Sequence, residues 1–478
     1  MSAFGGLPAL ARLAWRDAAR HPGRSLLVAA LLALPTGMLA SATVVLRTSD
    51  LAASRSFGMG NLFMLVFLPI AAVAALTAAA AIGVGARRQL RELGLLAAAG
   101  GSVRHLRLLV LLQGFGLGLL GGLAGIPLGL AATWATFPWL RGLLTPTQDE
   151  TGAPVIPRFS VIGRDMAWTV AFTVTLALVS ALRPAVTAGR VPVVAALAGR
   201  RPPRRLRPWL VAAGLVVSLA GLVLQGVADQ LDARGVIVPV QLELLALGGF
   251  GSIPSPLLIT LAGMALCTPA LVGLVGRVVP PRPAALRLAA RDAARNPGRS
   301  APAVTAVAAG LGMLVVLAGL ATLSSPESSG WLVRSQAGFY ELEPGAAPAF
   351  PPALRVLLAI FTVLVVAVVL AVNALGRAEA RDDLAVLEAL GASPRTRRAL
   401  AAASAWLLTE LGALLGAAAG LSPLLVQRAV HSLPARNPMA VPWPTLALVV
   451  LAVPAVAAAA AALTTGGSSP SPAERRPA

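Results

Sequence analysis

The sequence of 478 residues contains no lysine and few of the residues that build enzyme active sites. All 39 basic residues are arginine, and charged residues make up 12% of the chain, about half the share of a soluble protein. A chain without lysine cannot carry a standard P-loop ATPase site. The single cysteine, Cys267, excludes an intrachain disulfide, and three scattered histidines without a cysteine pair predict no metal site. The sequence therefore predicts no catalytic grouping, no cofactor and no enzyme.

Hydrophobic residues make up 57% of the chain, and its mean hydropathy is +0.80. Apolar runs recur at the length that crosses a bilayer as a helix, about 20 residues. We therefore predict an all-α polytopic membrane protein with about ten transmembrane helices. The expected spans are Ser25–Leu46, Asn61–Val84, Leu108–Trp134, Met166–Leu182, Trp209–Val227, Pro254–Val275, Ala301–Leu323, Val356–Leu375, Leu400–Val426 and Val441–Leu463. The region Gly235–Ser252 is ambiguous, because it reads either as an interfacial helix or as part of a longer sixth span.

The net charge of +20 raises the question of nucleic-acid binding. With both termini in the cytoplasm, most arginines fall in the cytoplasmic segments, as the positive-inside rule requires. The basicity then reflects orientation in the cytoplasmic (plasma) membrane and contact with anionic membrane lipids. We expect no nucleic-acid partner. The heavy use of alanine and arginine indicates a GC-rich, bacterial genome.

Two stretches of the sequence occur twice, in the same order. The stretch Leu13–Ser25 returns as Leu288–Ser300, and Leu93–Ser102 returns more loosely as Leu384–Ser393. These two repeated stretches, called the first and second echo, divide the spans into a 4 + 2 + 4 arrangement, with two parallel repeats around a central pair of spans. The expected segments are an amphipathic elbow helix (1–24), a four-helix repeat (25–186), a linker with the central pair (187–281), a second elbow helix (282–300), a second repeat (301–463) and a disordered cytoplasmic tail (464–478).

The first echo predicts a short amphipathic helix on the cytoplasmic surface. Arg12, Arg16 and Arg20 recur every four residues on one face, which suits a helix lying among lipid headgroups. Such a helix can be an anchoring elbow or a lever that tilts with the span it precedes, and the two roles are compatible.

The second echo predicts a rigid turn in the cytoplasmic loop of each repeat. Gly100 and Gly391 suit the end of a short helix, and Ser102 and Ser393 suit the N-cap of the following span. A short helix, a sharp turn and a span would project from the membrane to dock a cytoplasmic partner. The alternative is a solvated loop with no partner.

Two further features lie in the span after each turn. Small residues four apart allow close packing of helices, and they recur at Gly121, Gly125, Gly129, Gly412, Gly416 and Gly420. Glu410 is the acidic residue that we place well inside a span, where its counterpart in the first repeat is Leu119. Glu410 is either a functional intramembrane carboxylate or a group near the interface that bonds a neighbouring helix.

The stretch Arg91–Ser102 (RELGLLAAAGGS) resembles a signature of the FtsX-like, or MacB-like, ABC transporter permeases, and the following glycine-rich helix is also similar. The whole chain resembles members with two such modules. The resemblance implies that the cytoplasmic loops dock on a separate ATP-binding subunit, in two copies. The implied docking residues are Arg91, Glu92, Gly100 and Ser102 in the first loop and Asp383, Glu388, Gly391 and Ser393 in the second.

The chain departs from that family pattern in two ways. Asp382-Asp383 replace Arg91-Glu92, and Glu388 stands opposite Ala97, so the two docking sites are electrostatically unlike. The outer loops near 47–60 and 324–355 are too short for a large extracytoplasmic domain.

We therefore expect a permease subunit that couples ATP hydrolysis in a partner to export or extraction of an amphiphile such as a lipid, peptide or drug. One alternative is a non-transporting transducer that passes ATPase motion to an envelope or signalling partner. The other is a secondary carrier, which would need several intramembrane charges.

Overall fold

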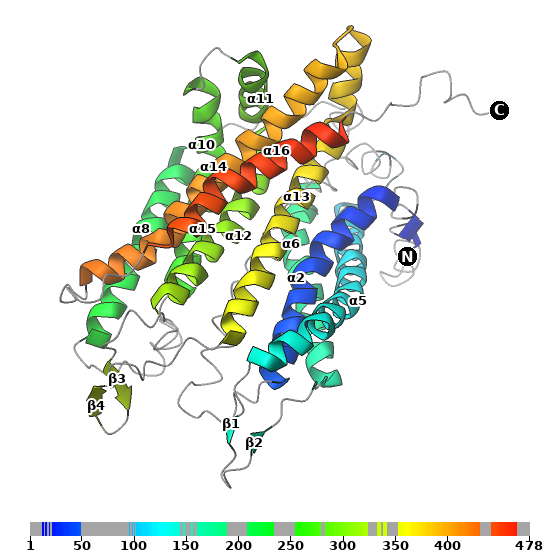
Figure 1. Ribbon diagram of the computed structural model, residues 1–478. Coiled ribbons are helices and arrows are strands. Elements are labelled where there is room, and N and C mark those ends of the chain that lie inside the picture. Colours follow the sequence, from blue (N-terminus) through cyan, green and yellow to red (C-terminus); the bar gives the residue numbers. More distant parts are fainter. Residues whose placement is uncertain are drawn as a thin grey trace.

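A computed structural model describes residues 12–13, 15–16, 19, 22–48, 95, 98, 100, 102–143, 147–148, 154–155, 159, 161–188, 208–233, 254–278, 283–323, 332–335, 338–341, 352–430 and 441–465. Long helices dominate these residues (Figure 1). The helices are α2 (Pro22–Thr48), α5 (Val103–Leu143), α6 (Gly163–Ala188), α8 (Pro208–Ala233), α10 (Pro254–Val278), α11 (Ala284–Arg295), α12 (Pro297–Leu323), α13 (Pro352–Ala389), α14 (Pro394–Val430), α15 (Trp443–Ala447) and α16 (Val453–Thr464).

Seven of the described helical segments are long and apolar enough to cross a membrane. They correspond to seven of the ten expected spans, and the chain is a multi-pass membrane protein. Two further expected spans are the apolar helices α2 and α8, whose described apolar stretches are shorter, Val28–Val44 and Trp209–Leu224. The expected span at 61–84 and the ambiguous region 235–252 lie outside the described residues.

Three helices are much longer than a bilayer requires. α5, α13 and α14 contain 41, 38 and 37 residues, which is about 55–60 Å at 1.5 Å per residue, against a hydrocarbon core of about 30 Å. α13 and α14 project together beyond the other helices at one end of the molecule (Figure 1). The expectation of a separate short helix before the second turn is wrong, because α13 runs without a break from Pro352 to Ala389.

Four short strands lie at the opposite end, so the prediction of a purely α-helical chain needs a small correction. β1 (Thr147–Gln148) pairs with β2 (Pro154–Val155), and β3 (Leu332–Ser335) pairs with β4 (Gly338–Glu341), both antiparallel. Segments of two to four residues carry too little alternating pattern to be read from sequence. Figure 1 shows both hairpins beyond the ends of the helices.

The two halves of the chain repeat one packing scheme. α5 packs against α2 and α6 in the first half, and α14 packs against α12 and α16 in the second. α13 joins the halves, because it contacts α12 on one side and α2 on the other. The pair α8 and α10 packs on the second half, where α10 contacts α11, α12 and α14.

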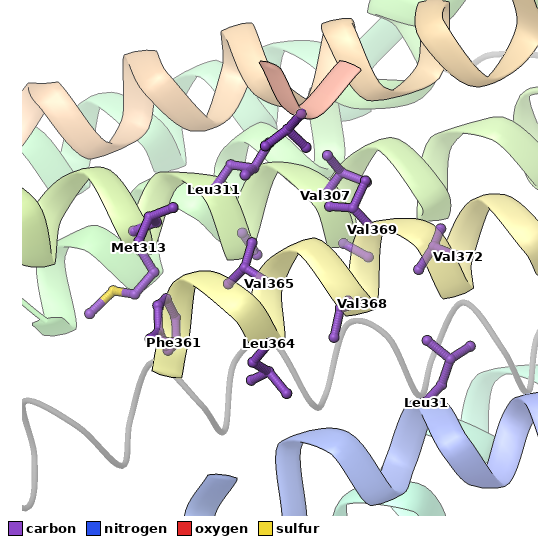
Figure 2. Close-up of a cluster of buried hydrophobic side chains, with 14 of the residues drawn as sticks. Leu31, Val307, Leu311, Met313, Phe361, Leu364, Val365, Val368, Val369 and Val372 are labelled. Carbon is purple, nitrogen blue, oxygen red and sulfur yellow. The ribbon is translucent and has the colours of Figure 1, made fainter. Parts of the chain in front are cut away.

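A large part of the buried core lies between α12 and α13. Leu311 and Leu314 of α12 and Phe361 of α13 are almost completely buried. In Figure 2, valine side chains of α13 face α12, while Leu31 of α2 lies across from α13 on its other side. The β-branched side chains have few rotamers to lose, which favours a rigid contact.

The last span contains one turn of π-helix, Leu448–Ala452, between α15 and α16. The amide of Val453 donates to the carbonyl of Leu448, five residues back. Pro454 has no N–H to offer Val450, which interrupts the α-helical ladder at this point.

Candidate functional site

The second cytoplasmic turn ends α13 with a glycine in the left-handed conformation. Gly391 has φ +85°, and its amide donates to the carbonyl of Glu388 at 2.9 Å. The amide of Ala392 donates to the carbonyl of Leu387 at 2.9 Å. These two bonds are those of a Schellman motif, which stops a helix sharply.

The next helix begins at once, capped by Ser393. The amide of Thr396 donates to Oγ of Ser393 at 3.2 Å, and the two hydroxyl oxygens lie 2.9 Å apart. Pro394 occupies the first helical position, where its missing N–H has no consequence. The chain therefore reverses direction in four residues, and a cap closes each helix end at the turn.

An ion pair braces this turn from the outside. The guanidinium of Arg397 donates to Oε2 of Glu388 at 2.6 Å, which links the end of α13 to the start of α14. At the equivalent positions the first turn has Ala97 and Leu106 and cannot form this pair. Glu388, one of the expected docking residues, is thus engaged within the turn itself.

The first turn has a related geometry where it is described. Gly100 has φ +88°, and α5 begins at Val103, directly after Ser102. The amide of Ser102 donates to Nδ1 of His105 at 3.2 Å, and the amide of His105 donates to Oγ of Ser102 at 3.4 Å. Arg91 and Glu92 lie outside the described residues, and of Asp383 the structure describes only its place on α13.

Both turns expose apolar side chains near their tips. Leu390 is 78% exposed and Val386 59%, and Leu95 and Val103 are also exposed. Apolar side chains beside charged ones on a rigid projection are typical of a protein–protein contact.

The expected packing glycines lie at the contacts inside each half. A Cβ at Gly121 would lie 3.1 Å from the carbonyl oxygen of Ala29, one at Gly125 would lie 2.7 Å from that of Ala33, and one at Gly129 would overlap the backbone of Gly37.

The second half repeats this contact between α14 and α12. A Cβ at Gly412 would lie 3.1 Å from the carbonyl oxygen of Val304, and one at Gly416 would lie 2.6 Å from that of Ala308. At Gly420 a Cβ would meet the carbonyl oxygen of Gly312. The backbones of the paired helices are therefore in close contact in both halves.

Glu410 lies half-buried on α14, next to the fully buried Thr409. The amide of Asn373 on α13 donates to Oγ1 of Thr409 at 3.0 Å and to the carbonyl of Val369 at 2.9 Å. This pair was not among the residues predicted from the sequence, although an asparagine within an apolar run is a visible signal. Hydroxyls also bond between helices at Thr36–Thr173, Ser41–Thr133 and Thr268–Thr305.

We expect Asn373→Ala to destabilise the contact between α13 and α14 by about 1 kcal/mol, the usual value of a hydrogen bond between membrane helices. Thermal unfolding of the purified chain in detergent measures the change. Thr362→Ala is the matched control on α13, because the Thr362 hydroxyl bonds the carbonyl of Leu358 in its own helix. Equal losses in the two variants would contradict a special role for the pair.

The comparison with protein-family models identifies the two regions that contain the turns. The model of the FtsX-like permease C-terminal domain matches residues 61–193 and 355–467, which is just over half of the chain. The chain belongs to the FtsX-like permease family. The two matches are consistent with two FtsX-like modules in one chain, and curated proteins gave no match.

Membership of this family indicates a permease subunit of an ABC transporter. FtsX-like permease domains are membrane subunits without an ATPase of their own, and they typically work with an ATPase subunit. Among the described residues, no three His, Cys, Asp or Glu side chains come together to hold a metal ion.

Proposed function

We propose that this FtsX-like permease couples ATP hydrolysis in a separate ATPase to export or extraction of an amphiphilic substrate, such as a lipid, peptide or drug. It would work in a bacterial plasma membrane. The observation that carries the proposal is the braced hairpin of α13 and α14, in which α13 continues from its apolar stretch Phe361–Ala378 to the turn at Gly391.

The proposed membrane arrangement has ten spans, 4 + 2 + 4, with both termini in the cytoplasm. The repeated packing of α5 on α2 and of α14 on α12 supports two parallel repeats, with α8 and α10 as the central pair. Exposed arginines at the α13–α14 turn, Arg395 and Arg398, support a cytoplasmic location for that end.

The proposed docking surfaces are the two turns, one for each of two ATPase copies. Support comes from the exposed Leu390 and Leu95 and from the rigid capping at Gly391 and Gly100. The proposed docking residues remain Arg91, Glu92, Gly100, Ser102, Asp383, Glu388, Gly391 and Ser393. The Glu388–Arg397 pair makes the second surface stiffer and different in charge.

Movement of the second turn would reach the core directly. α13 carries both the exposed Val386 near the tip and the buried Phe361, with no helix break between them. Because Phe361 packs in the core that also contains α2 residues, a push on the tip would shift the contact between the two halves.

An amphiphilic substrate fits the intramembrane chemistry. Glu410 and Arg377 are charged side chains that the structure describes on α14 and α13, and the hydrogen bonds that join Asn373 to Thr409 and Thr305 to Thr268 between helices connect neutral amide and hydroxyl groups. Large apolar side chains are exposed along several helices, including Leu123, Leu215 and Leu219.

The test is ATP turnover by the permease and the ATPase that co-purifies with it, reconstituted in vesicles. We expect a panel of lipids and peptides to contain an amphiphile that raises turnover severalfold. A vesicle preparation of the ATPase alone is the control, since it should not respond. A panel without any stimulation would instead favour the transducer, which passes motion to another protein.

A further inference from the structure

The two repeats differ in what packs against one equivalent face. In the second repeat, α10 covers the face made by α11, α12 and α14. Ala290 is 1% exposed there, Ala301 on α12 is 5% exposed, and the Thr305 hydroxyl donates to that of Thr268 on α10 at 3.3 Å. α10 comes very close, because a Cβ at its Gly276 would lie 3.1 Å from the carbonyl oxygen of Ala290.

The first echo places the equivalent residues of the first repeat. Trp15 stands for Ala290, Leu26 for Ala301 and Ala30 for Thr305. Trp15 is 64% exposed and Leu26 is 67% exposed, and Ala30 is exposed as well. These three positions are therefore exposed in the first repeat, whereas the counterparts Ala290, Ala301 and Thr305 are buried in the second.

α5 extends the open face. Leu120 and Ala124 are exposed, whereas their counterparts on α14, Leu411 and Leu415, are partly buried beside α10 and α11. We call the open surface the Trp15 face, and it consists of Trp15, Leu26, Ala30, Leu120 and Ala124.

The side chains of the Trp15 face oppose the docking of another helix. Trp15 is the counterpart of Ala290, whose small side chain allows α10 to contact the backbone closely in the second repeat. The larger indole would prevent such a contact in the first repeat. Ala30 lacks the hydroxyl by which Thr305 bonds Thr268. Tryptophan prefers the level of the lipid headgroups, where its apolar ring and its N–H are both accommodated.

The positive charges beside Trp15 favour a ligand with an anionic group. Arg12 and Arg16 are exposed on the same elbow helix, one turn apart. The segment from Pro8 to Arg24 contains four arginines and one aspartate, so its net charge is positive. Leu26 and Ala30 follow on α2, one turn apart, in the direction of the membrane interior.

We propose that the Trp15 face binds an anionic phospholipid of the cytoplasmic leaflet. Its headgroup lies at Arg12 and Arg16, and an acyl chain runs along Leu26, Ala30 and Leu120. The lipid takes the place in the first repeat that α10 takes in the second. This inference is independent of which substrate the complex moves.

Native mass spectrometry of the full chain in mild detergent tests the site, with palmitoyl-oleoyl phosphatidylglycerol and the matching phosphatidylcholine as probes. We expect the wild type to retain phosphatidylglycerol in preference. Arg12→Gln with Arg16→Gln should weaken that binding about 30-fold, since each arginine near an anionic surface contributes roughly fivefold. Arg287→Gln with Arg291→Gln is the matched control at the equivalent positions, because α10 fills the equivalent face, and it should bind like the wild type.

A second readout uses Trp15 itself. Phosphatidylglycerol brominated in its acyl chains should quench the fluorescence of the wild type more than that of Trp15→Phe. Equal weakening in the two arginine variants, equal retention of the two lipids, or equal quenching of wild type and Trp15→Phe would each overturn the proposal. A dimer that dissociates in Trp15→Ala would also overturn it, because a second copy would then cover the face.

Discussion

Gly129→Ala is expected to destabilise the chain by about 3 kcal/mol, the upper part of the range for overpacked contacts. A Cβ at this position would overlap the carbonyl of Gly37, and backbone atoms cannot move aside as a flexible side chain can. The only relief is separation of α5 from α2 along their whole contact. Thermal unfolding in detergent and the amount of folded chain in membranes measure the loss.

Gly116→Ala is the matched control on the same helix. No atom lies within 4 Å of the Cβ that it would add. Alanine is preferred over glycine inside a helix by about 0.5–1 kcal/mol, so this variant should be slightly more stable than the wild type. An equal loss of stability in the two variants would contradict the close backbone contact of α2 and α5 at Gly129.

The second half offers an internal replicate. Gly420→Ala would bring a Cβ to 2.8 Å from that of Val315 and against the carbonyl of Gly312. Gly376→Ala on α13, where the added Cβ meets open space, is its control. A large loss at Gly420 with little change at Gly376 is the expected pair of results.

The sequence predicts the chemistry at helix ends well, because glycine and serine act there through local geometry. Gly100 and Gly391 do adopt positive φ, and α5 and α14 begin directly after Ser102 and Ser393. The extent of α13 was not predictable from hydropathy alone. Its polar stretch after Leu375 ends the apolar run, yet it contains no glycine or proline after Gly376 that would break the helix.

Contacts between distant helices are the part that sequence reasoning could not reach. Asn373 and Thr409 are each visible as polar residues in apolar runs, but only the crossing of α13 and α14 makes them partners. The repeats also hide a difference, since similar elbows lead to helices with unlike neighbours. Trp15 in place of Ala290 marks that difference in the sequence, and the packing of α10 explains it.

Leu390→Asp is expected to weaken the complex with the ATPase about 30-fold. A buried apolar anchor at the centre of an interface contributes about 2 kcal/mol or more, which corresponds to this factor. Leu390 is 78% exposed beside Gly391, so the change should leave the permease folded. Leu463→Asp is the matched control, because Leu463 is 80% exposed at the end of α16, a helix that forms neither turn. Co-purification and the dissociation constant measured in detergent compare ATPase binding by the two variants.

The first turn allows the same test. Leu95→Asp changes an exposed leucine before Gly100, in the turn that lacks the Glu388–Arg397 pair. If each turn holds one ATPase copy, either variant leaves a complex with a single copy and the double variant leaves none. If the ATPase binds Leu390→Asp and Leu463→Asp equally well, the tip of the α13–α14 hairpin does not dock it. The number of ATPase copies bound to each single variant then decides between two docking surfaces and one. If only one turn docks the ATPase, a change in that turn releases both copies, and a change in the other turn releases neither.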